Sequence, residues 1–152
     1  MRFVELLTPD RIDTGLSVTS KAAALGAMAW LLARGAPTLG EATILRALQA
    51  REETASTGVG DEVAVPHGRV AGLDKLVAAF SLAPDGVEFD AIDGRPVRIL
   101  VSIIAPERAS GDHIRALACV ARILHDGASR GLLLDARTPD EVLRIMAECD
   151  RS

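Results

Sequence analysis

Two runs of apolar residues, 76–82 and 97–104, constrain the fold more than any other feature of the sequence. They read Leu-Val-Ala-Ala-Phe-Ser-Leu and Val-Arg-Ile-Leu-Val-Ser-Ile-Ile. β-branched and aromatic residues favour strands, and a strand that lacks polar alternation is covered on both faces. We therefore predict two central strands of a sheet that carries helices on both sides.

A helical pattern precedes these runs. Thr19 or Ser20 can cap a helix that runs to Arg34, with apolar residues at helical spacing along one face. Gly35 suits the left-handed position after a helix. This helix is predicted to pack inward against the sheet.

Three further helices are predicted from their start signals. Residues 38–41 have capping-box spacing and open a helix that ends near Arg51. Asp112 can cap a helix, and Thr138 opens a last helix toward Cys149. The helix after Asp112 is predicted to turn one apolar stripe inward: Ile114, Leu117, Ala118, Ala121 and Leu124.

The chain between the second helix and the first central strand is predicted to be mostly loop. Residues 52–61 are polar and contain glycine, and a short strand over residues 63–65 is then stopped by Pro66. His67 follows just beyond the end of that strand.

Two segments remain ambiguous, residues 128–136 and residues 11–16, the latter fitting an edge strand. We find no internal repeat and no linker long enough to divide the chain. The alternation of helical and strand patterns predicts an α/β fold, with residues 1–152 forming a single domain.

Charge and hydropathy argue against three classes of protein. The formal net charge is -4, and only four aromatic side chains are present, so a basic patch or stacking platform for nucleic acid is not expected. The longest uncharged run, residues 22–33, is shorter than the roughly 20 residues of a membrane span. The N-terminus carries acids where a secretion signal requires an apolar stretch. A soluble cytoplasmic protein is therefore expected.

The two cysteines carry no metal signature. Cys119 and Cys149 have neither CxxC spacing nor histidines at zinc-finger intervals. We interpret them as reduced structural thiols and expect no metal and no cofactor.

Residues 51–60 hold the groups that an oxyanion site requires. Arg51 can form charge-assisted bonds, while Ser56, Thr57 and the backbone N–H of Gly58 can converge on an anion. His67 returns beside this loop, and a neutral imidazole is a competent nucleophile near neutral pH. The plainer interpretations stay open, because loop histidines are often solvated, hydroxyls often serve turns, and an arginine suits a helix C-terminus.

The other two histidines lead to different expectations about a chemical role. His113 lies at the start of the helix after the second central strand, and strand ends and helix N-termini gather at one edge of an α/β sheet. His67 and His113 can therefore meet, although His113 can also be a partly exposed helix residue. His125 decorates a helix end, and we assign it no chemistry.

The loop and the strand after it resemble a known family. The segments Ser-Thr-Gly-Val-Gly at 56–60 and Val-Ala-Val-Pro-His-Gly at 63–68 resemble the signature of type-2 (fructose/mannitol-type) IIA domains of the bacterial phosphoenolpyruvate-dependent phosphotransferase system. Residues 51–52, 89–97 and 105–107 extend the resemblance over nearly the whole chain, as does His113 with the Leu-Ala pair behind it. With no fused membrane or IIB segment, the chain is most similar to nitrogen-regulatory IIA proteins.

The resemblance implies a mixed sheet flanked by helices and a phosphocarrier function. It implies that His67 accepts a phosphoryl group at Nε2 from an HPr-like phosphohistidine carrier, and that His113 assists by hydrogen bonding. Arg51 and the Ser56, Thr57 and Gly58 loop would support the phosphoryl oxygens. Sensor kinases or ion transporters would be the regulatory targets, and apolar residues around His67 would form the docking surface.

Two alternatives remain. A sugar-specific IIA would pass the phosphoryl group to a cysteine of a separate IIB protein, and a non-catalytic module would only sense an anion.

The sequence departs from the family pattern at two places: the family commonly has glycine where Glu62 stands and Leu-Gly where residues 54–55 read Thr-Ala. The acids Asp61 and Glu62 could tune the phosphorylated form or the choice of donor, or simply face solvent.

Overall fold

The two apolar runs form neighbouring antiparallel strands at the centre of the sheet. The computed structural model describes residues 1–108 and 110–150, Ser110 by its backbone alone. Strand β5 spans Val77–Val87, and β6 spans Val97–Pro106, with Phe80 opposite Val101. Nearly every side chain of β6 is buried, which confirms the prediction of central strands covered on both faces.

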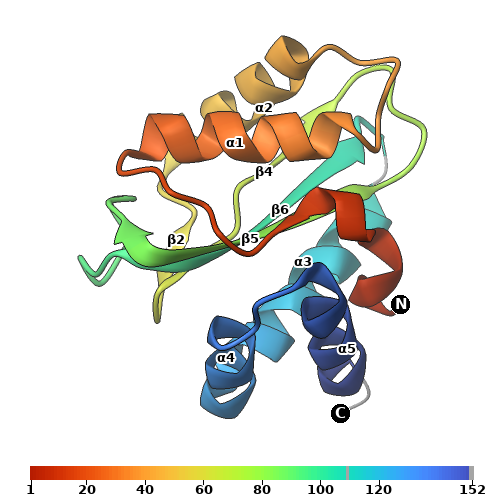
Figure 1. Cartoon of the computed structure of the whole chain (residues 1–152). Helices are drawn as coiled ribbons and strands as arrows, with labels where there is room; N and C mark the ends of the chain where they lie inside the picture. The colour runs from red at the N-terminus through yellow and green to blue at the C-terminus, as the bar shows by residue number, and fades with distance from the viewer. Residues whose placement is uncertain (109, 151–152) are drawn as a thin grey trace.

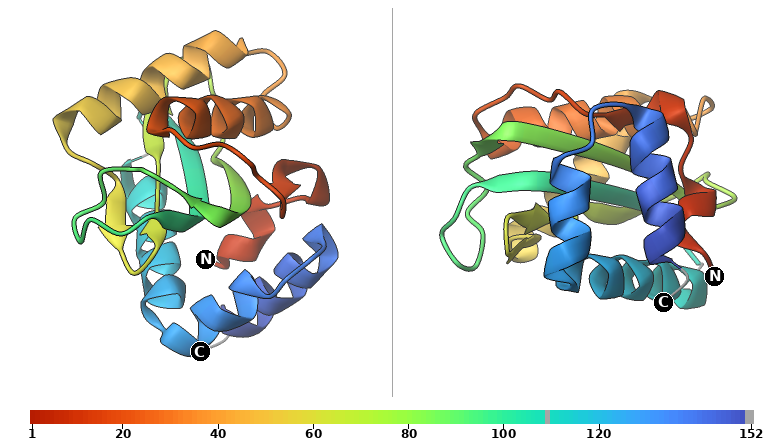
Figure 2. Two further views of the ribbon diagram at one scale, coloured as in Figure 1. Left: turned by 60° about the vertical axis from the view of Figure 1, so that its left-hand side comes forward. Right: turned by 60° about the horizontal axis from the view of Figure 1, so that its bottom comes forward.

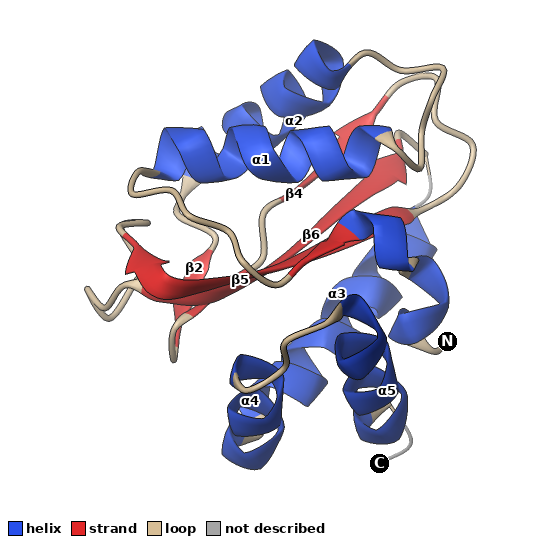
Figure 3. Ribbon diagram, viewed as in Figure 1, coloured by secondary structure: helices blue, strands red, loops and turns tan. Residues whose placement is uncertain are grey.

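Four shorter strands complete a mixed sheet (Figure 3). Strand β1 (Ile12–Asp13) pairs in parallel with β5, which confirms the predicted edge strand. Strands β3 (Val63–Ala64) and β4 (His67–Val70) both pair in parallel with β6, and β2 (Gly58–Gly60) pairs antiparallel with β3. Pro66, which has no N–H for the ladder, separates β3 from β4.

Helices cover the two faces of the sheet (Figures 1 and 2). Helices α1 (Lys21–Ala33) and α2 (Glu41–Thr54) pack on one face around a core that includes Met28, Leu32 and Leu100. The opposite face carries α3 (Ser110–His125), α4 (Gly127–Leu134) and α5 (Pro139–Cys149). The short 3-10 segments Phe3–Leu6 and Pro9–Arg11 precede β1. The architecture is the predicted α/β sandwich of helices around one sheet.

Two predicted helix starts are confirmed by their caps. The Ser20 hydroxyl accepts a hydrogen bond from the Ala23 N–H at 3.1 Å. The Thr138 hydroxyl accepts from the Glu141 N–H at 3.2 Å, as a capping box requires. The ambiguous residues 128–136 fall largely in α4, whose cap is Asp126.

The predicted bounds of α2 are wrong at both ends. Its N-cap is Gly40 rather than Thr38, because the residues just before it form a turn in which the Leu39 N–H donates to the Ala36 carbonyl. The helix continues past Arg51 to Thr54, so its last turn enters the segment predicted as loop.

Three further expectations about the helices are wrong. Gly35 does not adopt the left-handed conformation, and a Cβ there would lie 2.5 Å from Cγ1 of Val77, so close approach requires the glycine. Helix α3 begins at Ser110, which places Asp112 inside its first turn rather than at a cap. The face of α3 that packs on the sheet includes Ala116, Val120 and Ile123, while most of the predicted stripe is exposed.

None of the described helices combines the length and the apolar character needed to cross a bilayer.

Two buried serines in the central strands lead to a stability prediction. The hydroxyls of Ser81 and Ser102 have no hydrogen-bond partner among the described residues, although both side chains are fully buried. Because an unsatisfied buried hydroxyl costs free energy, Ser102→Ala is expected to raise the free energy of unfolding by up to about 1 kcal/mol. Urea denaturation measures this.

Ser129 provides the matched control for that measurement. It is buried as well, but its hydroxyl donates to Asp126 at 2.7 Å. Ser129→Ala is therefore expected to lower the free energy of unfolding, and a loss of stability in Ser102→Ala as large as that in Ser129→Ala would contradict the prediction.

Candidate functional site

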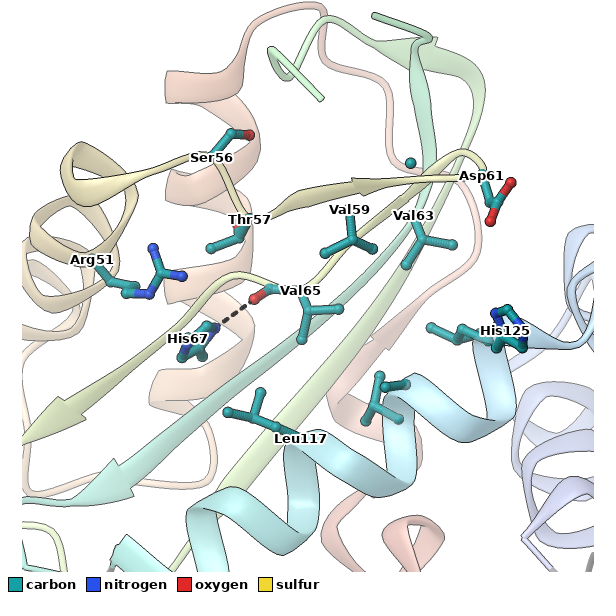
Figure 4. Close-up of a pocket in the computed structure, with 14 residues that line it drawn as sticks. Arg51, Ser56, Thr57, Val59, Asp61, Val63, Val65, His67, Leu117 and His125 are labelled. Atoms are coloured by element: carbon teal, nitrogen blue, oxygen red, sulfur yellow. Dashed lines mark hydrogen bonds between the residues drawn. The ribbon is translucent and has the colours of Figure 1, made fainter. Parts of the chain in front are cut away.

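His67 is fixed by the strand that it begins. It is the first residue of β4 rather than a loop residue beyond β3, and it lies opposite Ile103. Nδ1 of His67 lies 2.8 Å from the Val65 carbonyl oxygen (Figure 4). Since a carbonyl only accepts, Nδ1 carries the proton and the neutral ring keeps its lone pair on Nε2.

The surroundings of His67 favour the neutral ring. Burial is the largest influence and lowers the pKa of His67 below its ordinary value. The Val65 carbonyl opposes that shift, Arg51 adds to it, and Glu52 opposes it. Nε2 is therefore available as a nucleophile at neutral pH.

His113 meets His67 across the fold. The two ring centroids lie 5.4 Å apart with the planes at 73°. His113 is only 5% exposed, so it is a buried residue rather than a partly exposed one. Its Nε2 is buried and has no hydrogen-bond partner within the described part of the chain. Burial, the neighbouring His67 and Arg69 lower the pKa of His113 to about 4.

The burial of His113 makes the stability of the fold depend on pH. The unfolded chain binds a proton at His113 near pH 6.5, whereas the folded protein does so only near pH 4. The stabilising effect of the neutral ring is thus complete above pH 6.5 and is lost progressively as the pH falls toward 4. Between pH 6.5 and pH 4, the free energy of unfolding of the wild type is expected to fall by about 2 to 3 kcal/mol more than that of His113→Gln.

Denaturant unfolding of both proteins at matched pH values measures the difference. Parallel curves for the wild type and His113→Gln would contradict the lowered pKa of His113 in the folded protein.

Arg51 places a positive charge near His67. It lies in the last turns of α2, and its Nη1 donates to the Ala55 carbonyl at 2.9 Å. Figure 4 shows its guanidinium group on the same side of the pocket as the His67 ring. Arg51 and His67 line the same cavity, and a phosphate contact by Arg51 stays a prediction.

The loop residues predicted to hold phosphate have partners within the protein. The Ser56 hydroxyl donates to the Phe89 carbonyl and accepts from the Gly58 N–H, both at 3.1 Å. The Thr57 hydroxyl donates to Glu52 at 2.6 Å. A Cβ at Gly58 would lie 2.8 Å from Cα of Ala91, so glycine permits a close approach of two backbones. A phosphate contact by these three residues stays a prediction.

Sequence reasoning misses Glu52 and Lys21. The Glu52 carboxylate is buried, although the sequence of its segment is typical of a polar loop, and it pairs with Lys21 at 3.1 Å. The available signal is the Arg-Glu pair at 51–52, which by itself indicates only a family resemblance. Nothing in the local sequence indicates that Lys21, on another helix, lies opposite.

A mainly apolar cavity of about 390 Å³ extends from Arg51 and His67 to His125. Its floor is formed by residues of α3, including Leu117, Val120, Ala121 and Leu124. This explains the error in the predicted inward stripe of α3: part of that stripe faces the cavity instead of the sheet core. His125, a residue without a predicted chemical role, lies at the far end (Figure 4).

Asp61 and Glu62 form the tight turn between β2 and β3. Both have positive φ, 56° and 67°, a conformation that favours glycine. Glu62 pairs with Arg95 at 3.1 Å and with Arg98 at 3.3 Å, and its carbonyl accepts from β6. These bonds hold the turn against the sheet. They stabilise the positive φ of Glu62, at the position where the resembling family commonly has glycine. Asp61 lines the cavity.

The described residues contain no cluster of three or more His, Cys, Asp or Glu side chains placed to hold a metal ion. The cysteines lie apart from the cavity: Cys119 donates to the Met1 carbonyl, and Cys149 donates to the Ser129 hydroxyl.

Comparison with known proteins finds relatives over nearly the whole chain. The family model described as "Phosphoenolpyruvate-dependent sugar phosphotransferase system, EIIA 2" matches residues 5–149. A nitrogen regulatory protein of Bradyrhizobium diazoefficiens is 34% identical over 149 residues, which cover 97% of this chain and 95% of the relative.

Two solved structures share the fold. The nitrogen regulatory protein IIA-Ntr of Neisseria meningitidis superimposes with a TM-score of 0.89 at 34% identity, covering 94% of this chain and 97% of that one. The mannitol IIA of Escherichia coli gives a TM-score of 0.77 at 25% identity, covering 93% of this chain and 99% of that one.

Proposed function

Because this chain belongs to the EIIA 2 family of the phosphoenolpyruvate-dependent sugar phosphotransferase system, we propose that it is a phosphocarrier that accepts a phosphoryl group on His67. The observation that carries the proposal is the hydrogen bond between Nδ1 of His67 and the Val65 carbonyl. It leaves Nε2 as the nucleophilic nitrogen, in a cavity that also holds Arg51.

The proposed step is an in-line transfer between two imidazoles. The N–P bond of a phosphohistidine on an HPr-like carrier breaks as the N–P bond to Nε2 of His67 forms. The carrier's nitrogen regains its lone pair, and the proton on Nδ1 of His67 stays against the Val65 carbonyl. The donor is already a phosphohistidine, so the protein's task is positioning and charge stabilisation.

Two side chains would stabilise the phosphoryl oxygens. Arg51 lies at the cavity and forms charge-assisted bonds with anions readily. His113 is neutral at pH 7, and its Nε2, which has no hydrogen-bond partner among the described residues, would donate to the new group. The loop before β2 would help to bind the phosphoryl group by keeping its shape, which is maintained by the hydrogen bonds of Ser56, Thr57 and Gly58.

We place the protein in the regulatory, nitrogen-related branch. Support comes from the likeness to nitrogen regulatory proteins, with 34% identity over nearly the whole chain and a TM-score of 0.89. Phosphorylation would add roughly 1.5 to 2 negative charges to an apolar concave surface, which changes the partners that dock there. Sensor kinases or ion transporters are the proposed targets, and the cytoplasm is the proposed compartment.

A second candidate is a sugar-specific IIA that passes the phosphoryl group to a IIB protein. The observation in its favour is the shared fold with a mannitol IIA at a TM-score of 0.77. Transfer of label from the phosphorylated protein to the cysteine of a IIB domain would identify it.

The test of the proposed function is labelling from phosphoenolpyruvate through purified enzyme I and an HPr-like carrier, with carriers of the nitrogen and sugar branches compared. An acid-labile, base-stable phosphate that forms faster with the nitrogen-branch carrier is expected. Absence of labelling with both carriers would favour a module that only senses anions.

A further inference from the structure

Glu52 has a buried carboxylate whose hydrogen bonds reach across a loop. Both carboxylate oxygens accept from the Thr57 N–H, at 2.9 and 3.0 Å, and the Thr57 hydroxyl donates at 2.6 Å. The side chain is only 6% exposed. These bonds tie the last turn of α2 to the residue that precedes β2 and so close the loop between them.

Lys21 neutralises this carboxylate from another helix. Its ammonium group at the start of α1 lies 3.1 Å from Oε1 of Glu52 and 3.6 Å from Asp90. It also lies over the Phe89 ring, 5.1 Å from the centroid. Lys21 is 23% exposed, so the pair with Glu52 is shielded from water and retains more of its attraction than a surface pair does.

The tied loop contacts Arg51, a cation that lines the cavity. Arg51 is the neighbour of Glu52 in α2, and its guanidinium donates to Ala55, which lies within the loop that Glu52 closes. The position of Arg51 beside His67 therefore depends on bonds that Glu52 makes on the buried side of the same helix end.

The charges at this helix end also act on His67 in opposite senses. Arg51 lowers the pKa of His67, and Glu52 raises it. A dianionic phosphoryl group at Nε2 would be attracted by Arg51 and repelled by Glu52. Because Lys21 neutralises Glu52, it leaves the attraction of Arg51 largely unopposed.

We propose that Glu52, neutralised by Lys21, is a positioning residue for phosphoryl transfer: it fixes the loop that orients Arg51, while Lys21 shields the incoming phosphoryl group from its charge. This inference rests on the proposed function for the transfer step. The placement of Glu52, Lys21 and Thr57 stands independently of it.

The expected effects follow from the separate parts played by the two residues. Glu52→Gln keeps a hydrogen-bond acceptor for Thr57 but removes the ion pair, and transfer to His67 is expected to slow about tenfold. Lys21→Met leaves a buried carboxylate without its cation beside the phosphoryl group, and a loss of about a hundredfold is expected. The double variant is expected to transfer at about the rate of Glu52→Gln, because no uncompensated charge remains.

The experiment measures single-turnover transfer from the phosphorylated HPr-like carrier to full-length protein, together with NMR titration of the His67 ring. The matched control is Glu53→Gln, which removes the same charge from the exposed neighbouring position. Lys21→Arg is expected to restore most of the rate. The carrier concentration at half-maximal rate is expected to stay unchanged in every variant.

The titration separates positioning from general damage. Glu52→Gln removes a negative charge and is expected to lower the pKa of His67, whereas Lys21→Met removes a positive charge and is expected to raise it. Shifts of the same sign, or rates equal to those of Glu53→Gln in variants that fold, would overturn the proposal. If the wild type is not labelled, the proposed function fails, and the opposite pKa shifts still test the placement of the ion pair.

Discussion

His67→Ala is expected to abolish acid-labile labelling from the phosphorylated HPr-like carrier. The substitution removes the imidazole whose Nδ1 is fixed by the Val65 carbonyl and which lines the cavity together with Arg51. Without the nucleophile no N–P bond can form at this site, so the loss is complete rather than partial. Labelling is measured by retention of radioactive phosphate at alkaline pH and its release in acid.

Folding of the His67→Ala variant is checked by circular dichroism, since His67 begins β4 and its ring is half-buried. His125→Ala is a matched control, because it removes an exposed imidazole from the far end of the same cavity. Labelling of folded His67→Ala at the wild-type rate would refute the assignment of the acceptor.

His113→Ala is expected to retain the acceptor and to slow transfer by about 10²-fold to 10³-fold. The reason is the position of its ring, 5.4 Å from that of His67, and a buried Nε2 without a partner in the described structure. A hydrogen bond from this nitrogen would strengthen as charge accumulates on the transferring oxygens. The wild-type and variant rates are compared by single-turnover transfer.

The slower His113→Ala protein should still reach full labelling at long times, with the same acid lability. Complete loss of labelling in a folded variant would mean that His113 carries the phosphoryl group, and an unchanged rate would mean that it has no part in the transfer.

The sequence predicts what depends on local chemistry. The apolar runs at 76–82 and 97–104 specify central strands because few other structures bury so many consecutive residues. Ser20 and Thr138 cap their helices as their side chains allow. The approach of His67 to His113 follows from a rule about sheet edges, and the 5.4 Å between their rings confirms it.

Tertiary contacts determine what the sequence does not reveal. Thr38 has the spacing of a cap, yet a turn before Gly40 supplies the start of α2. Glu52 has the sequence context of a solvated acid, and its tertiary partners Lys21 and Thr57 make its burial possible. Leu117 resembles a core residue because an apolar cavity and a core contain the same residue types.

The central claim is that Nε2 of His67 carries the phosphoryl group, and NMR of ¹⁵N-histidine-labelled, phosphorylated protein tests it most directly. The account predicts ¹⁵N–³¹P coupling at Nε2 of His67 alone, with Nδ1 still bearing its proton against the Val65 carbonyl. Coupling at Nδ1 of His67, or at either nitrogen of His113, would contradict it.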